Sequence, residues 1–185
     1  MLSDLFVRHE SGRPPQLATR QSARLRRVDV ESPGRDAGSL FAAMEIAGLG
    51  ACLGPPDRAP DPGTVRRWAT VVQLVALLAG TQGARAHDPG RSAGRAIRGA
   101  DYSEARMMRL LASRGAGLRG GVVRLARFLA AKRVGALDLR PLAELVLHEG
   151  RDEARAERAR LALARGFYGG VAVPKTDDDT NETDE

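Results

Sequence analysis

The sequence predicts an all-α fold of about eight helices, and two features of the chain support this. Apolar residues recur at helical spacing, whereas no segment bounded by turns shows the period-two alternation of a strand. Aromatic residues make up only 4% of the chain although hydrophobic residues make up 43%. We therefore expect a core built from leucine, valine and alanine on packed helices.

Five helices are expected in the N-terminal part: residues 2–9, 17–28, 37–47, 65–79 and 101–113. The segment 65–79 is apolar nearly all round, which predicts a helix buried at the centre of the core. Asp101 and Glu104 have the spacing of a capping box, which predicts the start of the fifth helix. Loops rich in proline or glycine are expected over 54–63 and 80–94.

Residues 115–121 contain four glycines, and each glycine inside a helix costs about 1 kcal/mol relative to alanine. We therefore expect a glycine-rich joint here, between an N-terminal helical domain (1–114) and a C-terminal one (118–173). The C-terminal domain would hold three helices. The first carries Leu118, Val122, Leu125 and Leu129, the second begins at Asp138 with Pro141 in its first turn, and the third spans 151–168. The acidic residues 174–185 are expected to be a disordered tail.

Composition excludes several classes of protein. The single cysteine, Cys52, rules out a disulfide scaffold and a cysteine-based zinc site, and the three histidines lack metal-ligand spacing. The N-terminus has no basic segment followed by an apolar run, and the longest apolar stretch (69–80) is too short to cross a membrane. We expect a soluble, cytoplasmic protein without cofactor or metal.

Two strings imitate catalytic or cofactor patterns, and neither has the required context. Residues 115–120 spell G-x-G-x-x-G but follow a predicted helix instead of a strand. Residues 90–94 spell G-x-S-x-G around Ser92, with Asp138 and His148 following in hydrolase order, but no strand delivers the serine to a turn. The sequence therefore predicts no enzyme.

The strongest remaining signal is arginine. Of 29 basic residues only Lys132 and Lys175 are lysine, and residues 85–133 hold twelve bases against three acids. Arg20, Arg24, Arg26 and Arg27 form a second cluster. Guanidinium groups bind phosphate oxygens in pairs, which favours nucleic-acid contact. Exposed aromatics are not interleaved, so base stacking is not expected. The alternative is a solvated basic surface that reflects only composition.

Several strings occur in a characteristic order. They are ARLRR over 23–27, Arg66 before the apolar helix, GRAI over 94–97, EAR over 104–106, VRLARFL over 123–129, ALDL over 136–139 and FY at 167–168. In order and spacing the chain resembles the CasB family, the small subunit of the type I-E CRISPR surveillance complex Cascade. The resemblance covers about residues 17–170.

The resemblance implies a non-catalytic protein of two helical domains that serves antiviral defence. Two copies would lie head to tail beside the other Cascade subunits and the guide RNA, and would hold the displaced, non-target strand of the target DNA. Matching the family strings implies contacts by Arg26, Arg27, Arg66, Arg95, Arg106, and Arg124 or Arg127. The basic clusters add neighbouring candidates, namely Arg24, Arg91, Arg98 and Arg109.

Some positions depart from the family. Pro14 and Pro15 interrupt the usual long first helix, and Leu139 stands where tryptophan is common. Beside the interpretation as a Cascade subunit, two other classes of protein stay open: a stand-alone helical DNA-binding protein and a structural helical adaptor without nucleic-acid contact. Backbone binding predicts a salt dependence with a slope of about −0.7 per phosphate on a single strand.

Overall fold

A computed structural model describes residues 19–79 and 86–169. Over these two ranges the chain forms eight α-helices, two short 3-10 helices and no strand, which confirms the all-α prediction. The α-helices are α1 (Thr19–Leu25), α2 (Ala37–Ile46), α3 (Pro62–Ala79), α4 (Ala93–Gly99), α5 (Glu104–Ala112), α6 (Gly115–Ala131), α7 (Arg140–His148) and α8 (Glu153–Tyr168). The 3-10 helices are η2 (Pro33–Asp36) and η3 (Gly50–Leu53). The predicted helix over 2–9 and the acidic tail lie outside the described residues.

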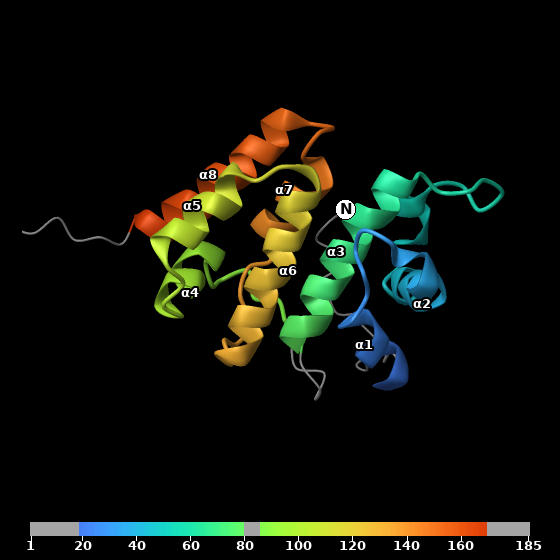
Figure 1. The fold of residues 1–185 in the computed structure, drawn as a ribbon, viewed down its shortest axis with the longest axis horizontal. Coiled ribbons are helices and arrows are strands. Elements are labelled where there is room, and N and C mark those ends of the chain that lie inside the picture. The colour runs from blue at the N-terminus through green and yellow to red at the C-terminus, as the bar shows by residue number, and fades with distance from the viewer. Residues whose placement is uncertain (1–18, 80–85, 170–185) are drawn as a thin grey trace, which may run out of the picture.

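Helices α3 and α6 lie side by side at the middle of the molecule (Figure 1). Helices α1 and α2 pack on one side of this pair, and α7 packs against both members of it. Trp68, Val71 and Leu74 of α3 are buried, as the nearly all-apolar segment predicted. None of the helices in the described ranges is long and apolar enough to cross a membrane.

The glycine-rich segment 115–121 is helical, so the structure does not confirm a hinge there. Gly115 has a left-handed φ of +52° at the start of α6, and Gly121 is buried inside the helix. A Cβ atom at Gly121 would lie 2.8 Å from Leu110 Cδ1. The absent side chain therefore lets α5 approach α6 closely, an advantage that helix propensity alone does not reveal. The division into two domains stays a prediction.

Helix α4 was not predicted because the residues buried at helical spacing, Ala93, Ala96, Ile97 and Ala100, are mostly alanine and give only a weak apolar signal. It packs against α8 through two glycines, where a methyl group at Gly94 would overlap the backbone at Leu163 and Phe167. A methyl group at Gly166 would lie 2.6 Å from Ser92 Oγ. The two helices can therefore approach to backbone contact.

The predicted capping box at Asp101 is wrong. Asp101 has a φ of +62°, and the helix begins two residues after Tyr102, with Ser103 at the N-cap. Asp138 likewise lies one residue before the N-cap of α7, which is Leu139. Asp138 Oδ1 nevertheless accepts a hydrogen bond of 3.1 Å from the Arg140 backbone N–H, so it satisfies one amide of the first turn of α7, whereas Asp101 marks only the approximate start of α5.

An ion pair joins the N-terminal and C-terminal parts of the chain. Arg119 on α6 donates two hydrogen bonds of 2.7 Å to the Glu31 carboxylate. Arg66 Nε on α3 donates to the Glu31 backbone oxygen at 3.1 Å. The Arg119 guanidinium holds the pKa of the Glu31 carboxyl below its ordinary value. One short segment after α1 is thereby fastened to both central helices.

Candidate nucleic-acid interface

The candidate arginines come from five helices and their flanks. Arg24 lies on α1 and Arg66 on α3, and Arg26 and Arg27 directly follow α1. The remaining candidates are Arg91, Arg95 and Arg98 at α4, Arg106 and Arg109 on α5, and Arg124 and Arg127 on α6. The structure gathers three of them, Arg106, Arg109 and Arg124, around one pocket.

This hollow, here called the α5–α6 pocket, has a volume of about 290 Å³. Its lining residues are Tyr102, Arg106, Arg109, Leu110, Ser113, Gly121, Arg124 and Phe128. The two arginines of α5 are three residues apart and so share one face of that helix. The close approach that Gly121 permits brings Arg124 of α6 to the same hollow. The helical spacing on α5 and the close approach at Gly121 thus bring three positive charges together at the pocket.

The three pocket arginines are exposed, and none pairs with a carboxylate among the described residues. Burial raises the pKa of the Tyr102 hydroxyl, and the nearby charges of Arg106, Arg124 and Arg109 oppose that rise. The tyrosine thus lies in the positive field of all three guanidinium groups. Unpaired guanidinium groups are available to bind phosphate oxygens.

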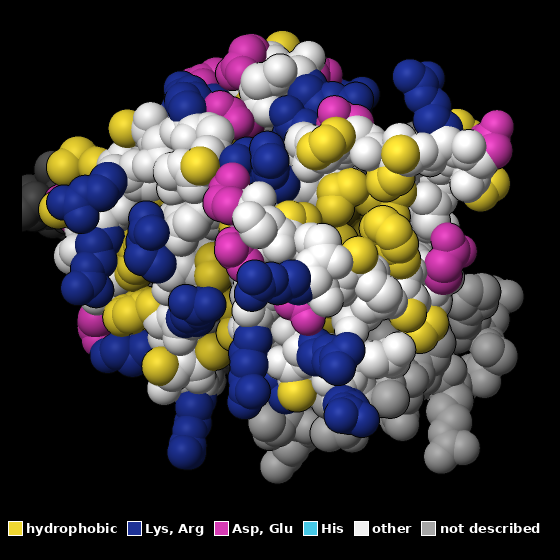
Figure 2. Space-filling view, turned by 45° about the vertical axis from the view of Figure 1, so that its right-hand side comes forward, with side chains coloured by type: hydrophobic (Ala, Val, Ile, Leu, Met, Phe, Trp, Pro, Cys, Tyr) yellow, Lys and Arg dark blue, Asp and Glu magenta, His cyan; other side chains and the backbone are white. Residues whose placement is uncertain are grey.

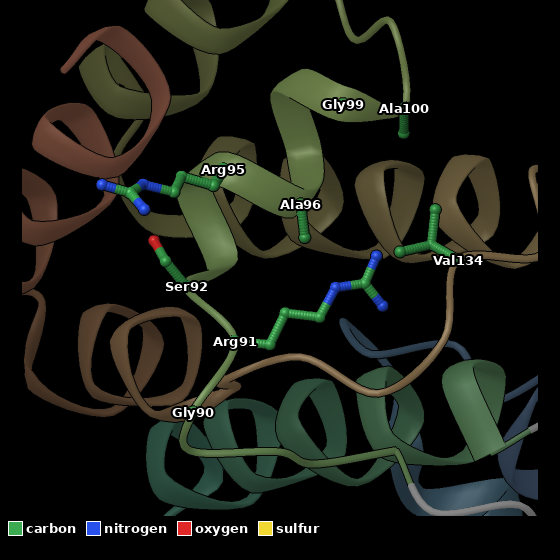
Figure 3. Close-up of a pocket in the computed structure, with 8 residues that line it drawn as sticks. All are labelled: Gly90, Arg91, Ser92, Arg95, Ala96, Gly99, Ala100 and Val134. Atoms are coloured by element: carbon green, nitrogen blue, oxygen red, sulfur yellow. The ribbon is translucent and has the colours of Figure 1, made fainter. Parts of the chain in front are cut away.

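A second pocket, of about 390 Å³, lies at the start of α4 and is lined by Arg91, Ser92, Arg95 and Val134 among others. In Figure 3 the Arg91 side chain extends across it towards Val134, whereas Arg95 points away. Arg91 Nη1 also donates to the Ala136 carbonyl oxygen at 3.2 Å. The larger pocket therefore presents fewer converging charges than the α5–α6 pocket.

Two other candidate arginines have bonds within the fold. Arg98 Nη1 donates to the Phe167 carbonyl oxygen at 3.1 Å and so fastens α4 to the end of α8. Arg66 is held by the Glu31 backbone. The exposed candidates Arg24, Arg27, Arg95 and Arg127 do not line the α5–α6 pocket.

The segment after α1 is positioned by a buried glutamine of α3. Gln73 Nε2 donates to the carbonyl oxygens of Arg26 and Val28 at 3.1 and 3.0 Å. This residue holds the backbone at Arg26 and Arg27 against the central helix. Nothing in the sequence pattern identified Gln73 as a residue that positions this segment.

Figure 2 shows one face on which basic side chains gather over the left-hand and lower parts, while an apolar patch occupies the right-hand part. Acidic side chains are few among the basic ones on the left of this view. Like charges grouped in this way raise the local positive potential and attract polyanions.

The residues of the two rejected catalytic patterns have other contacts. The Asp138 carboxylate pairs with Arg140 at 2.9 Å and lies 3.7 Å from His87. Its histidine neighbour is therefore His87 and not His148, which the hydrolase order of the sequence would require. Gly94 packs against α8, and residues 115–120 lie inside α6. Among the described residues no group of three or more histidine, cysteine or carboxylate side chains gathers as a metal site.

The sequence missed Tyr102 and Phe128 as site residues. Their rings meet edge to face with centroids 5.2 Å apart, and both line the α5–α6 pocket. They are far apart in sequence, so no local pattern of aromatic and basic residues predicted this contact. The signal in the sequence that could have pointed to them is that they are the two aromatic residues within the arginine-rich segment 85–133.

Comparison with protein families matches residues 21–168 to CRISPR-associated protein Cse2. The chain belongs to the Cse2 family. This confirms the resemblance to CasB, because both names denote the small subunit of type I-E Cascade. The Cse2-family chain is therefore a subunit of a Cascade complex that contains other subunits. Comparisons with curated proteins and with solved structures give no match.

Proposed function

We propose that this Cse2-family subunit holds nucleic-acid backbone inside Cascade without reading base sequence. The observation that carries the proposal is the convergence of Arg106, Arg109 and Arg124, all exposed and without carboxylate partners in the described chain, on the α5–α6 pocket. Guanidinium groups that are free of carboxylates release counterions from phosphates when they bind.

By binding nucleic acid, the subunit stabilises the R-loop, the state in which guide RNA pairs with one DNA strand and displaces the other. Exchange of a DNA duplex for an RNA–DNA hybrid is nearly balanced in energy, so contacts between protein and backbone can decide it. The displaced strand of the target DNA is the proposed ligand, with the guide RNA as a further partner. A second copy of the subunit would extend the same basic surface.

The proposed role is non-catalytic and cytoplasmic. The α5–α6 pocket is lined by arginine, aromatic, serine and small or aliphatic residues, with no carboxylate, histidine or cysteine. General acid–base catalysis uses those missing groups most often, and a serine nucleophile needs an adjacent base of that kind. The lining thus suits binding of an anion better than bond cleavage.

The test is a salt titration of single-stranded DNA binding by the full chain, using several oligomers of unrelated sequence. The variant R106Q/R109Q/R124Q is expected to lose affinity on the order of 100-fold, equally for all sequences, and its salt slope should fall by about 2. The matched control R151Q/R158Q/R165Q removes the same charge from exposed positions of α8 and its N-terminal flank. It should retain most of the affinity.

Other outcomes would favour the alternatives. A sequence-specific footprint without guide RNA would indicate a stand-alone DNA-binding protein. Assembly with the other Cascade subunits but no salt-dependent nucleic-acid binding, by the wild type or within the complex, would indicate a structural adaptor. Equal losses in the pocket variant and the α8 control would show that only total charge matters and would overturn the assignment to the pocket.

A further inference from the structure

We propose that the α5–α6 pocket accepts one unstacked base of a single strand against Tyr102, while the pocket arginines bind the adjoining phosphates. This inference rests on the proposed function and adds to it a preference for single-stranded nucleic acid with bases present. It also reverses the expectation from sequence that base stacking plays no part.

The first argument is the aromatic wall of the pocket. Tyr102, from the turn before α5, and Phe128, from α6, meet edge to face with an interplanar angle of 62°. Both are half-buried, so each ring is anchored in the core and still partly exposed. Lys132 Nζ lies 5.8 Å from the centre of the Phe128 ring. Phe128 thus already has a cation–π contact within the fold. We therefore assign Tyr102 as the ring on which the base stacks.

The second argument is the polar environment of Tyr102. Its hydroxyl group has no hydrogen-bond partner among the described residues. Three guanidinium groups act on it electrostatically. A tyrosine hydroxyl group in contact with ligand usually donates a hydrogen bond, and phosphate oxygens or base carbonyl groups accept one. The ring and its hydroxyl group can therefore contact a base and an anionic backbone together.

The third argument is the mixed lining. A site for phosphate alone needs only donors and positive charge, yet Leu110, Gly121 and both aromatic rings form part of this hollow. An unstacked base would cover these apolar atoms, and arginine planes add stacking surface of their own. Bases in a duplex are stacked on their neighbours and would not reach the ring. The pocket therefore selects strands whose bases are free, such as a displaced strand.

The test compares two fluorescent oligomers of equal length, one of deoxythymidine and one with abasic residues throughout, in binding titrations with the full chain. The wild type is expected to bind the deoxythymidine oligomer about fivefold more tightly. Tyr102→Leu should abolish that difference while leaving the salt slope unchanged. Tyr102→Phe should keep it, because the ring remains.

The control is Phe41→Leu, which removes an exposed aromatic ring of α2 away from the pocket. It should leave the difference between the two oligomers intact. Thermal unfolding followed by circular dichroism checks that each variant is folded. If Tyr102→Leu is unstable, tyrosine emission provides a second readout, because the quenching present in the wild type and absent in Tyr102→Phe comes from Tyr102. Wild-type emission should fall when deoxythymidine binds, but not when the abasic oligomer binds.

The outcomes separate the two proposals. Equal affinity of the wild type for both oligomers would overturn the base pocket and leave backbone binding standing. Binding of neither oligomer would contradict both proposals. A base preference that survives in Tyr102→Leu would place the stacking surface elsewhere and overturn the present assignment.

Discussion

The two basic regions of the molecule differ in how their arginines are arranged. On α5 and α6, Arg106, Arg109 and Arg124 converge on one pocket with no carboxylate partner among the described residues. Near α1 and α3, Arg24 and Arg27 are exposed but outside that pocket, and Arg66 is bonded to the backbone of Glu31. In the sequence both regions stand out only as clusters of arginine.

The difference shows that counting arginines overestimates the charge available to a ligand. A guanidinium group that is bonded within the fold already uses some of its N–H donors. Breaking those bonds offsets part of the binding free energy that a phosphate contact would contribute. Converging arginines can also bind the same or adjoining phosphates. We therefore expect the pocket to dominate nucleic-acid affinity although both regions contribute to the net charge.

The largest predicted contrast is between variants of the two regions. R24Q/R27Q/R66Q should weaken single-stranded DNA binding about fivefold, against a loss on the order of 100-fold for the pocket variant. Fluorescence anisotropy at constant ionic strength measures both. Equal losses would show that the two regions act alike and would remove the distinction drawn above.

A smaller effect is expected from filling the pocket floor. Gly121→Val should push Leu110 away, cost about 2 kcal/mol of stability, and lower DNA affinity several-fold. Gly38→Ala is the matched control, because a Cβ atom there meets nothing within 4 Å. Chemical denaturation and DNA titration of both variants provide the measurement. An unchanged affinity in a folded Gly121→Val protein would argue against the pocket.

The stability contributed by the ion pair between Glu31 and Arg119, which links the two regions, is expected to depend on pH. Because the pKa of Glu31 in the folded protein lies below its ordinary value of 4.5, its stabilisation is complete above that pH and is lost as pH falls through the folded pKa. Glu31→Gln should lower stability by about 1 kcal/mol at neutral pH. It should also weaken the loss of stability on acidification, measured by urea unfolding at several pH values. A variant with an unchanged acid profile would contradict this.

The smallest effect on binding is predicted for Arg98. Its guanidinium group donates to the Phe167 carbonyl oxygen, so Arg98→Gln should alter DNA affinity less than about twofold. The melting temperature should fall slightly as α4 loses a contact with α8. Arg109→Gln, also a single charge change, is the comparison and should cost more affinity. A larger binding loss for Arg98→Gln would place it at the interface.

Much of the fold follows from local pattern. The apolar segment of α3 and the stripe of α6 were predicted because burial and helical periodicity act over a few turns. Glycine misled the prediction over 115–121, since its helix penalty is local whereas its benefit is contact with Leu110 of another helix. Family membership was predicted from the order of strings, which needs no three-dimensional information.

The site was predicted less completely than the fold. The sequence named all three pocket arginines among eleven candidates but could not tell them from Arg98, whose partner lies 69 residues away. The contact between Tyr102 and Phe128 depends on the approach of α5 to α6. Such contacts arise from tertiary packing, so no local window of sequence contains them.

The glycine contact between α4 and α8 has a consequence for how the protein can change over time. Backbone meets backbone at Gly94 and Gly166, so any added carbon atom would wedge the two helices apart. Arg95 lies one residue from that contact and Arg98 one turn beyond it. A larger residue at either glycine would therefore act as a spacer that displaces the arginines of α4, although neither glycine lines the α5–α6 pocket.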